Sequence, residues 1–432
     1  MEQRMRQKLD RRRQEGSLRE PLSTDELVTC HSLTVDFSSN DYLGLAQDKQ
    51  QQGLVEKSYK RWKKTSLSTL GATGSRLLSG DSLFCRELED CLAKVHNRPA
   101  AMIFNSGYDA NLSVLSSLLM MGDFVLLDEL CHNSLIMGVK MSRCREYNIF
   151  QHNDLLDLRK QLEQLVCKGK VMIVVESIYS MDGDVAPLQD ILDLAYNFGS
   201  EVVVDEAHGL GSFGRTNVID LSLDRQCCGQ STGDSNALGG TGVLAALELE
   251  SHPSLLCSIF TFGKAAGCHG AVVCGSTTLR DYLWNYARPF IYSTALPLHS
   301  LISIQSSYES MIGALGQARR NRTFANVRLF RDTLLSVLPS MSKVSLWPSP
   351  SPIQALVLPG NDNCVKFCWH LHNVHGIRLY PIRAPTVPKG KERVRIILHA
   401  HNSAEQVLKL AEVLLHTLKD MGLVESDFIS KL

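Results

Sequence analysis

Residues 259–275 read IFTFGKAAGCHGAVVCG and carry Lys264 between two apolar runs. The first run ends at Phe262, and the second covers residues 271–274. Continuous apolar runs predict strands that are buried on both faces, so Lys264 is expected in a crowded turn between two such strands. A lysine in these surroundings either extends its ammonium group to water or is kept for its chemistry. A desolvated lysine amine can form a Schiff base with a carbonyl, whereas a lysine on an ordinary exposed loop needs no such role.

Short apolar runs recur upstream of this turn and alternate with helical patterns. The runs cover residues 100–104, 124–127, 171–175 and 202–204. One helical pattern follows Asp154, a capping residue, and another ends at Gly199. This alternation predicts an α/β fold with a mostly parallel central sheet that is covered by helices.

The chain is predicted to have three parts. Residues 1–48 form an N-terminal arm whose basic helix, over residues 2–20, is expected to pack on the main body. Residues 49–297 form the large α/β domain, which contains a segment rich in Gly, Ser, Asn and Cys at 217–253 that reads as a surface insertion. Residues 298–432 form a smaller α+β domain.

Composition excludes several classes of partner. The 432 residues include 45 basic and 45 acidic side chains, with a pI near 7.2, so neither a polyanionic partner nor nucleic acid is expected. No apolar run approaches the ~20 residues that a membrane-spanning helix needs. The 13 cysteines are odd in number and scattered, a pattern typical of a reducing compartment. Cys227, Cys228, His399 and His401 lack the spacing of a metal site, so no metal is expected.

The last three residues, Ser430, Lys431 and Leu432, match the tripeptide that the peroxisomal import receptor binds. This predicts a peroxisomal protein. The residues before the tripeptide, ESDFI, are acidic rather than basic. A cytoplasmic location is the alternative.

Polar residues gather where the predicted strands end. Ligands in open parallel sheets bind at the carboxyl ends of the strands, so these residues are the candidates for a site. Asp205 and His208 follow one strand, Ser177 follows another, and His132 lies shortly after a third. Residues 106–108 begin a helix, where free backbone N–H groups favour a phosphate.

Together with Lys264, this set matches the needs of pyridoxal phosphate. The aldehyde of this cofactor requires an amine, its phosphate requires a helix start and hydroxyl groups, and its ring nitrogen requires an acid. Each residue has a plainer role available. Asp205 could cap a helix, the two histidines could be ordinary core residues, and Ser177 could belong to a turn.

Eight motifs then resemble those of one family, the α-oxoamine synthases, which are pyridoxal-phosphate enzymes of fold type I. The motifs are VDFSSNDYLGLA, GATGSRLLSG, IFNSGYDAN, VVESIYSMDGD, VVVDEAHGLGSFG, FTFGKAAGCHGA, RPFIYSTALP and PIRAPTVP, in this order from about residue 35. Within the family, the chain resembles most those members that condense L-alanine with pimeloyl-CoA in biotin synthesis. The resemblance implies a fold type I transferase that acts as a homodimer.

The resemblance also implies roles for individual residues. Lys264 would hold the cofactor and move the α-proton, Asp205 would pair with the ring nitrogen, and His208 would hydrogen-bond the ring hydroxyl. His132 would stack on the ring, which makes these four the catalytic set. The expected contacts of the phosphate and its surroundings are Ser106, Gly107, Tyr108, Ser177, Thr261 and, from the partner subunit, Thr294. Arg395 and Asn40 are expected at the substrate, where an arginine suits a carboxylate.

Some alternatives stay open at this stage. The chain could be an α-oxoamine synthase with another amino acid or acyl-CoA, a catalytically silent paralogue, or a plain aminotransferase. The segment at 217–253 could be a passive loop or could touch the acyl-CoA entrance. The residues after Ser82 read LFCRELE and lack a histidine that relatives commonly carry there, so the contacts of the acyl group are less defined than those of the cofactor.

Overall fold

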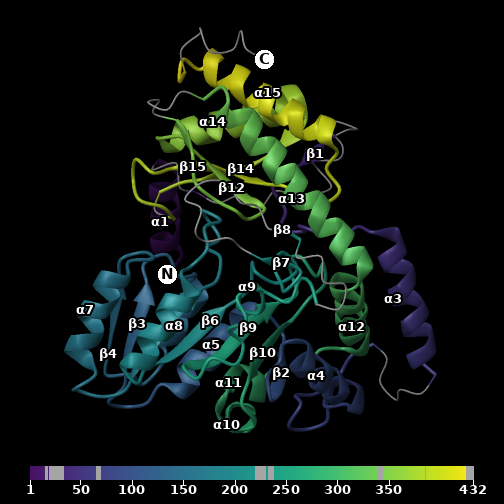
Figure 1. Cartoon of the computed structure of the whole chain (residues 1–432), viewed down its shortest axis with the longest axis vertical. Coiled ribbons are helices and arrows are strands. Elements are labelled where there is room, and N and C mark those ends of the chain that lie inside the picture. Colours follow the sequence, from purple (N-terminus) through teal and green to yellow (C-terminus); the bar gives the residue numbers. More distant parts are fainter. Residues whose placement is uncertain are drawn as a thin grey trace. The chain divides into compact units, whose positions relative to one another are not determined.

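The chain forms two compact units. The computed structural model describes residues 1–14, 18, 34–64, 70–218, 230–231, 238–338, 344–384 and 386–424. The large unit contains Asn40–Ser180 and Asp184–Arg322, and the small unit contains Met1–Ser39, Met181–Gly183 and Thr323–Leu432 (Figure 1). The tripeptide at 430–432 lies outside the described residues.

These units differ from the predicted parts at two boundaries. Helix α12 (Leu298–Ile312) belongs to the large unit because it packs on α3 (Lys49–Trp62) and α4 (Leu83–Val95). Gln51 joins α3 to α12, since its side chain donates to Ser306 Oγ over 3.3 Å and accepts from Ser310 Oγ over 2.6 Å. The end of the predicted arm belongs to the small unit, where β1 (Val35–Asp36) pairs in parallel with β13 (Ile377–Arg378).

A seven-stranded sheet forms the centre of the large unit. Its order is β2-β10-β9-β6-β5-β3-β4. The strands are β2 (Ala100–Phe104), β10 (Ala271–Gly275), β9 (Leu255–Thr261), β6 (Glu201–Asp205), β5 (Val171–Glu176), β3 (Phe124–Asp128) and β4 (Glu146–Phe150). Only the pairings of β10 with its two neighbours are antiparallel. The prediction of a mostly parallel sheet is therefore confirmed.

Helices cover this sheet and complete its core. One cluster of buried side chains joins the sheet to α5 (Gly107–Leu118), α6 (Asn133–Lys140), α10 (Thr277–Tyr286) and α11 (Arg288–Ile291). Helices α4, α7 (Leu155–Leu165) and α8 (Leu188–Asn197) contribute no residue to that cluster and contact β2, β3 and β6 instead. Such burial stabilises the fold by about 25 cal/mol per Å² of apolar surface.

Strand β4 was missed by the sequence analysis. It lies at the edge of the sheet, and only Phe150 among its five residues is buried. A strand with one covered face and one neighbour has no continuous apolar run, so the criterion that found the inner strands could not find it.

The predicted insertion at 217–253 is not a surface segment throughout. Its described residues include the short pair β7 (Asn217–Val218) and β8 (Gln230–Ser231) and the helix α9 (Val243–Ala246). All four residues of α9 are buried. Backbone N–H groups at the start of α9 donate to the buried carboxylate of Glu206, and this contact holds the second half of the segment inside the unit.

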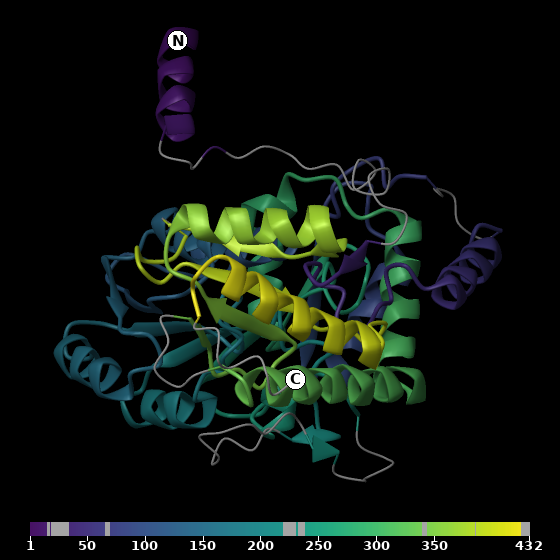
Figure 2. The ribbon, with the colours of Figure 1, turned by 90° about the horizontal axis from the view of Figure 1, so that it is seen from above.

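The small unit contains an antiparallel sheet and several helices. The strand order is β11 (Ser345–Leu346), β12 (Ile353–Val357), β15 (Arg393–Ile397) and β14 (Tyr380–Ile382). Helix α13 (Ala314–Leu335) enters this unit at Thr323, and α14 (Asn361–His375) and α15 (Ala404–Asp420) lie side by side (Figure 2). A capping box begins α15, because Ser403 and Gln406 exchange side-chain and backbone hydrogen bonds.

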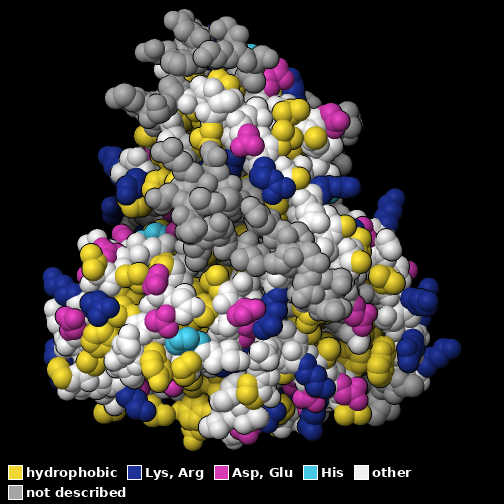
Figure 3. Space-filling view, in the orientation of Figure 1, with side chains coloured by type: hydrophobic (Ala, Val, Ile, Leu, Met, Phe, Trp, Pro, Cys, Tyr) yellow, Lys and Arg dark blue, Asp and Glu magenta, His cyan; other side chains and the backbone are white. Residues whose placement is uncertain are grey.

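The N-terminal helix α1 spans Glu2–Gln14, and none of its residues is buried. The expectation that it packs on the main body is therefore wrong, because Met5 and Leu9 are the only apolar side chains within the helix and both are exposed. On the face in Figure 3, basic and acidic side chains are interspersed, as the equal totals of 45 suggest. Within the described ranges, no helix combines the length and the apolar character that crossing a bilayer requires.

A charged histidine ties β3 to the turn that follows β5. His152 contacts Asp128 through Nδ1 over 2.8 Å and Asp184 through Nε2 over 2.7 Å. Burial alone would lower the pKa of His152, but the hydrogen bonds to the two carboxylates outweigh burial and raise that pKa to about 9. The imidazole is therefore protonated at neutral pH and bridges two acidic side chains.

This bridge predicts a pH dependence of stability. Because the folded-state pKa of His152 lies above its unfolded value, the stabilisation is complete below about pH 6.5 and disappears as the pH rises through about 9. We expect the variant His152→Gln to lose at most about 3 kcal/mol of unfolding free energy at pH 7, and less at pH 10. Urea unfolding at both pH values measures this difference. The matched control is His416→Gln on the exposed face of α15, and an equal loss for both variants would contradict the prediction.

Candidate functional site

A cavity of about 160 Å³ opens in the large unit at the carboxyl ends of β5, β6 and β9. Seven of the predicted site residues line it: Gly107, Tyr108, His132, Asp205, His208, Thr261 and Lys264. They come from four segments of the chain, 107–108, 132, 205–208 and 261–264, which the parallel sheet brings to one edge.

Lys264 lies in the predicted crowded turn after β9. Its neighbours Phe262 and Ala265 are buried, and its own side chain is half-buried. Lys264 Nζ lies 2.8 Å from His208 Nε2. The turn is closed by Gly267, whose φ of +62° suits glycine and where a Cβ atom would lie 2.5 Å from the backbone nitrogen of Ala46. The amine is thus held at the cavity by a tightly packed backbone.

Asp205 ends β6 and presents a carboxylate to the cavity. Its Oδ1 accepts the backbone N–H of Ala207 over 2.9 Å, and its Oδ2 accepts Asn111 Nδ2 over 2.7 Å. The side chain is 5% exposed. Two donors therefore fix the orientation of a buried negative charge, as pairing with a protonated ring nitrogen would require.

His132 stands at the start of α6, and its ring lines the same cavity. Its Nδ1 lies 2.7 Å from Ser134 Oγ, and Ser134 Oγ also accepts Asn111 Nδ2 over 2.9 Å. Burial lowers the pKa of His132, and the nearby Lys264 lowers it further against the opposing effect of Asp205. The ring is therefore neutral at pH 7, which suits a flat aromatic surface that stacks on another ring.

The start of α5 forms the part of the cavity that suits a phosphate. Gly107 and Tyr108 occupy its first two positions, where the backbone N–H groups have no partner within the helix. A Cβ atom on Gly107 would lie 3.1 Å from both Cβ and Oγ1 of Thr261. A glycine at this position leaves room that any side chain would fill, and it keeps the helix start and the threonine hydroxyl accessible to one anion.

These groups together fit pyridoxal phosphate. The cavity offers an amine, an oriented carboxylate, a neutral imidazole and a helix start without a Cβ atom at its first position. Each group corresponds to one chemical need of the cofactor.

Comparison with known proteins agrees with this chemistry. Residues 34–414 match the family described as aminotransferase class I and II. The chain belongs to this family. Among curated proteins, the 8-amino-7-oxononanoate synthase of Emericella nidulans is 35% identical over 94% of this chain and 96% of its own length. The predicted resemblance to the α-oxoamine synthases is therefore confirmed.

Solved structures of the same family support the fold and the cofactor. A serine palmitoyltransferase from S. paucimobilis, with bound PLP and myriocin, is 25% identical and has a TM-score of 0.77 over 90% of this chain and 89% of its own. The 8-amino-7-oxononanoate synthase of Francisella tularensis, at 24% identity, has a TM-score of 0.69 over 91% of this chain and 100% of its own. The predictions of a fold type I transferase and of pyridoxal phosphate are both confirmed.

Two serines that were predicted to grip the cofactor face elsewhere in this member of the family. Ser106 Oγ caps α5 by accepting the backbone N–H of Asp109, and it also donates to the Asp109 carboxylate. Ser177 Oγ donates to Glu206 Oε2 over 2.7 Å and is fully buried. Successive residues of a strand point to opposite faces, so Glu176 lines the cavity and Ser177 does not.

The other predicted residues lie outside the cavity lining. Thr294 is exposed, and its backbone oxygen accepts Asn105 Nδ2 over 2.9 Å in a separate small pocket. Arg395 lies half-buried on β15 of the small unit, opposite Ala355 on β12. Asn40 reaches the site through Tyr42, whose hydroxyl lies 3.4 Å from Asn40 Oδ1 and 2.5 Å from His208 Nδ1.

Four residues of the site escaped the sequence analysis: Tyr42, Asn111, Ser134 and Glu176. Glu176 ends β5, which was a signal that could have identified it. Burial raises the pKa of Glu176 well above its usual value, and the negative charge of Asp205 raises it further, while Lys264 acts in the opposite direction. Glu176 therefore favours its protonated form more than a free carboxyl group does.

The packing at Gly107 gives a test of the phosphate position. We expect Gly107→Ala to weaken the binding of pyridoxal phosphate about tenfold, because the added methyl group meets Thr261 where the anion must approach. Fluorescence titration of the apoprotein with the cofactor measures the change. The matched control is Gly53→Ala in α3, where no atom lies within 4 Å of the added group. Equal affinities for the two variants would place the phosphate elsewhere.

Proposed function

We propose that this chain condenses L-alanine with pimeloyl-CoA, with loss of carbon dioxide, to give 8-amino-7-oxononanoate and coenzyme A in biotin synthesis. The main observation behind the proposal is one cavity, which is lined by Lys264, His208 and Asp205 and by the first residues of α5. The relative that is 35% identical over almost the whole chain is named 8-amino-7-oxononanoate synthase, after the proposed product.

Pyridoxal phosphate, when bound, supplies a ring that accepts the electron pair left on the amino acid after the α-proton is removed. Lys264 Nζ would hold the cofactor through a covalent bond, and once the amine of the amino acid has replaced it in that bond, the freed Nζ would accept the α-proton as general base. His208 Nε2 lies 2.8 Å from this nitrogen and orients it. Asp205, whose carboxylate Asn111 orients, would hold a proton on the ring nitrogen, and His132 would offer an aromatic face to the ring.

Binding of the amino acid is assigned to Arg395 and Asn40. The planar guanidinium group of an arginine binds a carboxylate through two parallel hydrogen bonds. Asn40 is connected to the amine of Lys264 through Tyr42 and His208, so its amide is tied to the reacting group. The glycine and serine homologues of alanine differ at the side chain, so the carboxylate contact gives affinity but no discrimination among them.

The first experiment measures coenzyme A release by the purified protein with pyridoxal phosphate, L-alanine and pimeloyl-CoA. Parallel reactions contain glycine, L-serine or shorter acyl-CoAs. Preference for alanine and pimeloyl-CoA supports the proposal. Preference for another pair assigns the chain to a different reaction of the same kind, and the absence of release with every pair would indicate a catalytically silent subunit.

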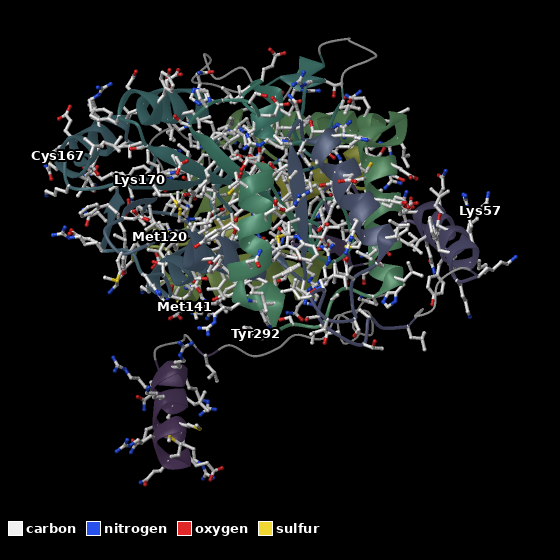
Figure 4. The ribbon with its side chains drawn as sticks, turned by 90° about the horizontal axis from the view of Figure 1, so that it is seen from below. Lys57, Met120, Met141, Cys167, Lys170 and Tyr292 are labelled. Carbon is white, nitrogen blue, oxygen red and sulfur yellow. The ribbon has the colours of Figure 1, made fainter. Side chains whose placement is uncertain are left out.

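The proposal includes a homodimer in which Thr294 contacts the phosphate bound to the partner chain. Just beyond the ends of α5, α6 and α11 lie Met120, Met141 and Tyr292, which are 53%, 61% and 77% exposed (Figure 4). Met and Tyr are enriched at protein–protein interfaces relative to the rest of the surface. Sedimentation analysis of the purified protein tests the assembly, and a monomer at micromolar concentration would oppose it.

A mixing experiment tests whether Thr294 acts across the dimer. The variants Lys264→Ala, which is expected to be inactive, and Thr294→Ala, which is expected to be impaired, are combined under conditions that exchange subunits. If Thr294 serves the partner's site, a mixed dimer contains one site with both residues intact, and activity returns. If Thr294 serves its own chain, both sites of the mixed dimer remain impaired and no activity returns.

A peroxisomal location is also part of the proposal. Its support is the match of residues 430–432 to the import tripeptide, which would let fatty-acid breakdown supply pimeloyl-CoA locally. A fluorescent protein fused before Met1 is expected to enter peroxisomes, and removal of Leu432 is expected to leave it in the cytoplasm. The same distribution for both proteins would favour the cytoplasmic alternative.

A further inference from the structure

Tyr42 has no assigned part in the reaction, yet its hydroxyl is built into the site. The ring is fully buried, and the hydroxyl lies 2.5 Å from His208 Nδ1. On the other side of the same imidazole, Nε2 lies 2.8 Å from Lys264 Nζ. The hydroxyl also lies 3.4 Å from Asn40 Oδ1. Four side chains thus form one row, in the order Lys264, His208, Tyr42 and Asn40.

The donors and acceptors of these four groups fix the direction of each hydrogen bond in the row. A lysine ammonium has three donors and no acceptor, so His208 Nε2 must accept from it. A neutral imidazole carries one proton, which then lies on Nδ1 and is donated to the oxygen of Tyr42. The hydroxyl hydrogen of Tyr42 is left to point at Asn40 Oδ1, which can only accept. Each group therefore donates to the next one.

The backbone around Tyr42 is held firmly enough to maintain this row. Both carboxylate oxygens of Asp41 accept backbone N–H groups, from Leu45 over 2.9 Å and from Ala46 over 3.1 Å. Arg319 donates to the carbonyl oxygens of Leu43 and Gly44 over 2.8 and 3.0 Å. Ala46 in turn packs against Gly267 in the turn that carries Lys264. The tyrosine and the lysine are therefore parts of one packed region.

We propose that Tyr42 is a positioning residue, which selects the His208 tautomer with the proton on Nδ1 and leaves Nε2 free to accept from Lys264. A phenylalanine at this position would fill the same space but would remove the hydroxyl oxygen that lies 2.5 Å from Nδ1. Loss of this hydrogen bond destabilises the tautomer with the proton on Nδ1, so the other tautomer would gain population. A hydroxyl is also able to reverse its role from acceptor to donor, so the same residue serves His208 when Nε2 must donate.

The test compares Tyr42→Phe with wild type in the cofactor-free protein, labelled with ¹⁵N at its histidines. The His208 ring resonances are identified by their loss in His208→Gln. In wild type, one tautomer is expected, with the proton on Nδ1. In Tyr42→Phe, we expect the tautomer ratio to shift at least about fivefold toward the form with the proton on Nε2. Asn40→Ala, which removes only the last acceptor, is expected to shift it less and in the same direction.

The matched control is Tyr179→Phe. Tyr179 is equally buried in the large unit, and its hydroxyl has no hydrogen-bond partner among the described residues. The two variants lose the same atom, so a merely structural effect would move the His208 resonances equally in both or in neither. Unchanged resonances in Tyr42→Phe, or equal changes in both variants, would overturn the inference. If Tyr42→Phe fails to fold, the Asn40→Ala spectrum decides.

The loaded enzyme gives a second readout, which rests on the proposed function. With saturating pyridoxal phosphate, we expect Tyr42→Phe to lower kcat about tenfold for coenzyme A release while KM for alanine changes less than about twofold. The tautomer experiment needs neither cofactor nor substrate. If the wild type releases no coenzyme A with any substrate pair, the proposed function fails, but the tautomer result is unaffected. If the ratio of His208 tautomers is the same in Tyr42→Phe and wild type, the inference fails, whatever the activity.

Discussion

Lys264→Ala is expected to lower turnover at least about 10⁴-fold. The substitution removes the only group at the cavity that is proposed both to hold the cofactor and to take the α-proton. The fold should remain, because the lysine is half-buried and its neighbours Phe262 and Ala265 supply the packing of the turn. Release of coenzyme A measures turnover, and thermal unfolding of the cofactor-free protein checks the fold.

The control for this variant is Lys57→Ala. Lys57 projects from α3 into solvent, away from the helix (Figure 4), so its loss removes a positive charge and leaves the cavity unchanged. We expect wild-type turnover from it. Turnover of Lys264→Ala within tenfold of that control would rule out Lys264 as the general base, and the proposed function would need another proton acceptor.

Asp205→Asn is expected to slow removal of the α-proton about 100-fold or more while cofactor binding changes little. The amide is almost the same size as the carboxylate but carries no negative charge to hold a proton on the ring nitrogen. The variant should fold, because Asn111 Oδ1 is buried without a hydrogen-bond partner among the described residues and can accept from the new amide if Asn111 rotates.

Exchange of the α-hydrogen of L-alanine in deuterium oxide, at saturating cofactor, measures this step without the acyl-CoA. The control is Asp281→Asn, which removes an exposed carboxylate on α10. An exchange rate in Asp205→Asn equal to that of the control would show that the charge at position 205 is not needed. A large loss of cofactor affinity would instead assign Asp205 to binding.

The residues at the centre of the site could be predicted because their signals are local. Lys264 lies between two apolar runs, and Asp205 closes a third, so each is marked by its position along the chain. Gly107 follows another apolar run and begins a helix, which marks a backbone site for an anion. A parallel sheet brings all such strand ends to one edge, so the cavity itself followed from the order of the elements.

The errors at strand ends have one physical cause. Glu176 and Ser177 are neighbours, and only Glu176 reaches the cavity. In a strand covered on both faces, the two alternate sets of side chains are equally buried, so the sequence does not reveal which set points to the ligand. Only the packing around Glu206, which accepts from Ser177 and from the start of α9, decided this.

The sequence is sufficient to predict the α/β class, the series of buried strands, the lysine between two of them and the chemistry of a pyridoxal-phosphate site. These properties depend on residues a few positions apart, whose apolar runs and turns form locally. The tertiary structure alone decided the partners of those residues. Tyr42 meets His208 from 166 positions away, and Asn111 meets Asp205 from 94. Contacts of this kind form only when separate elements pack together, and no local pattern encodes them.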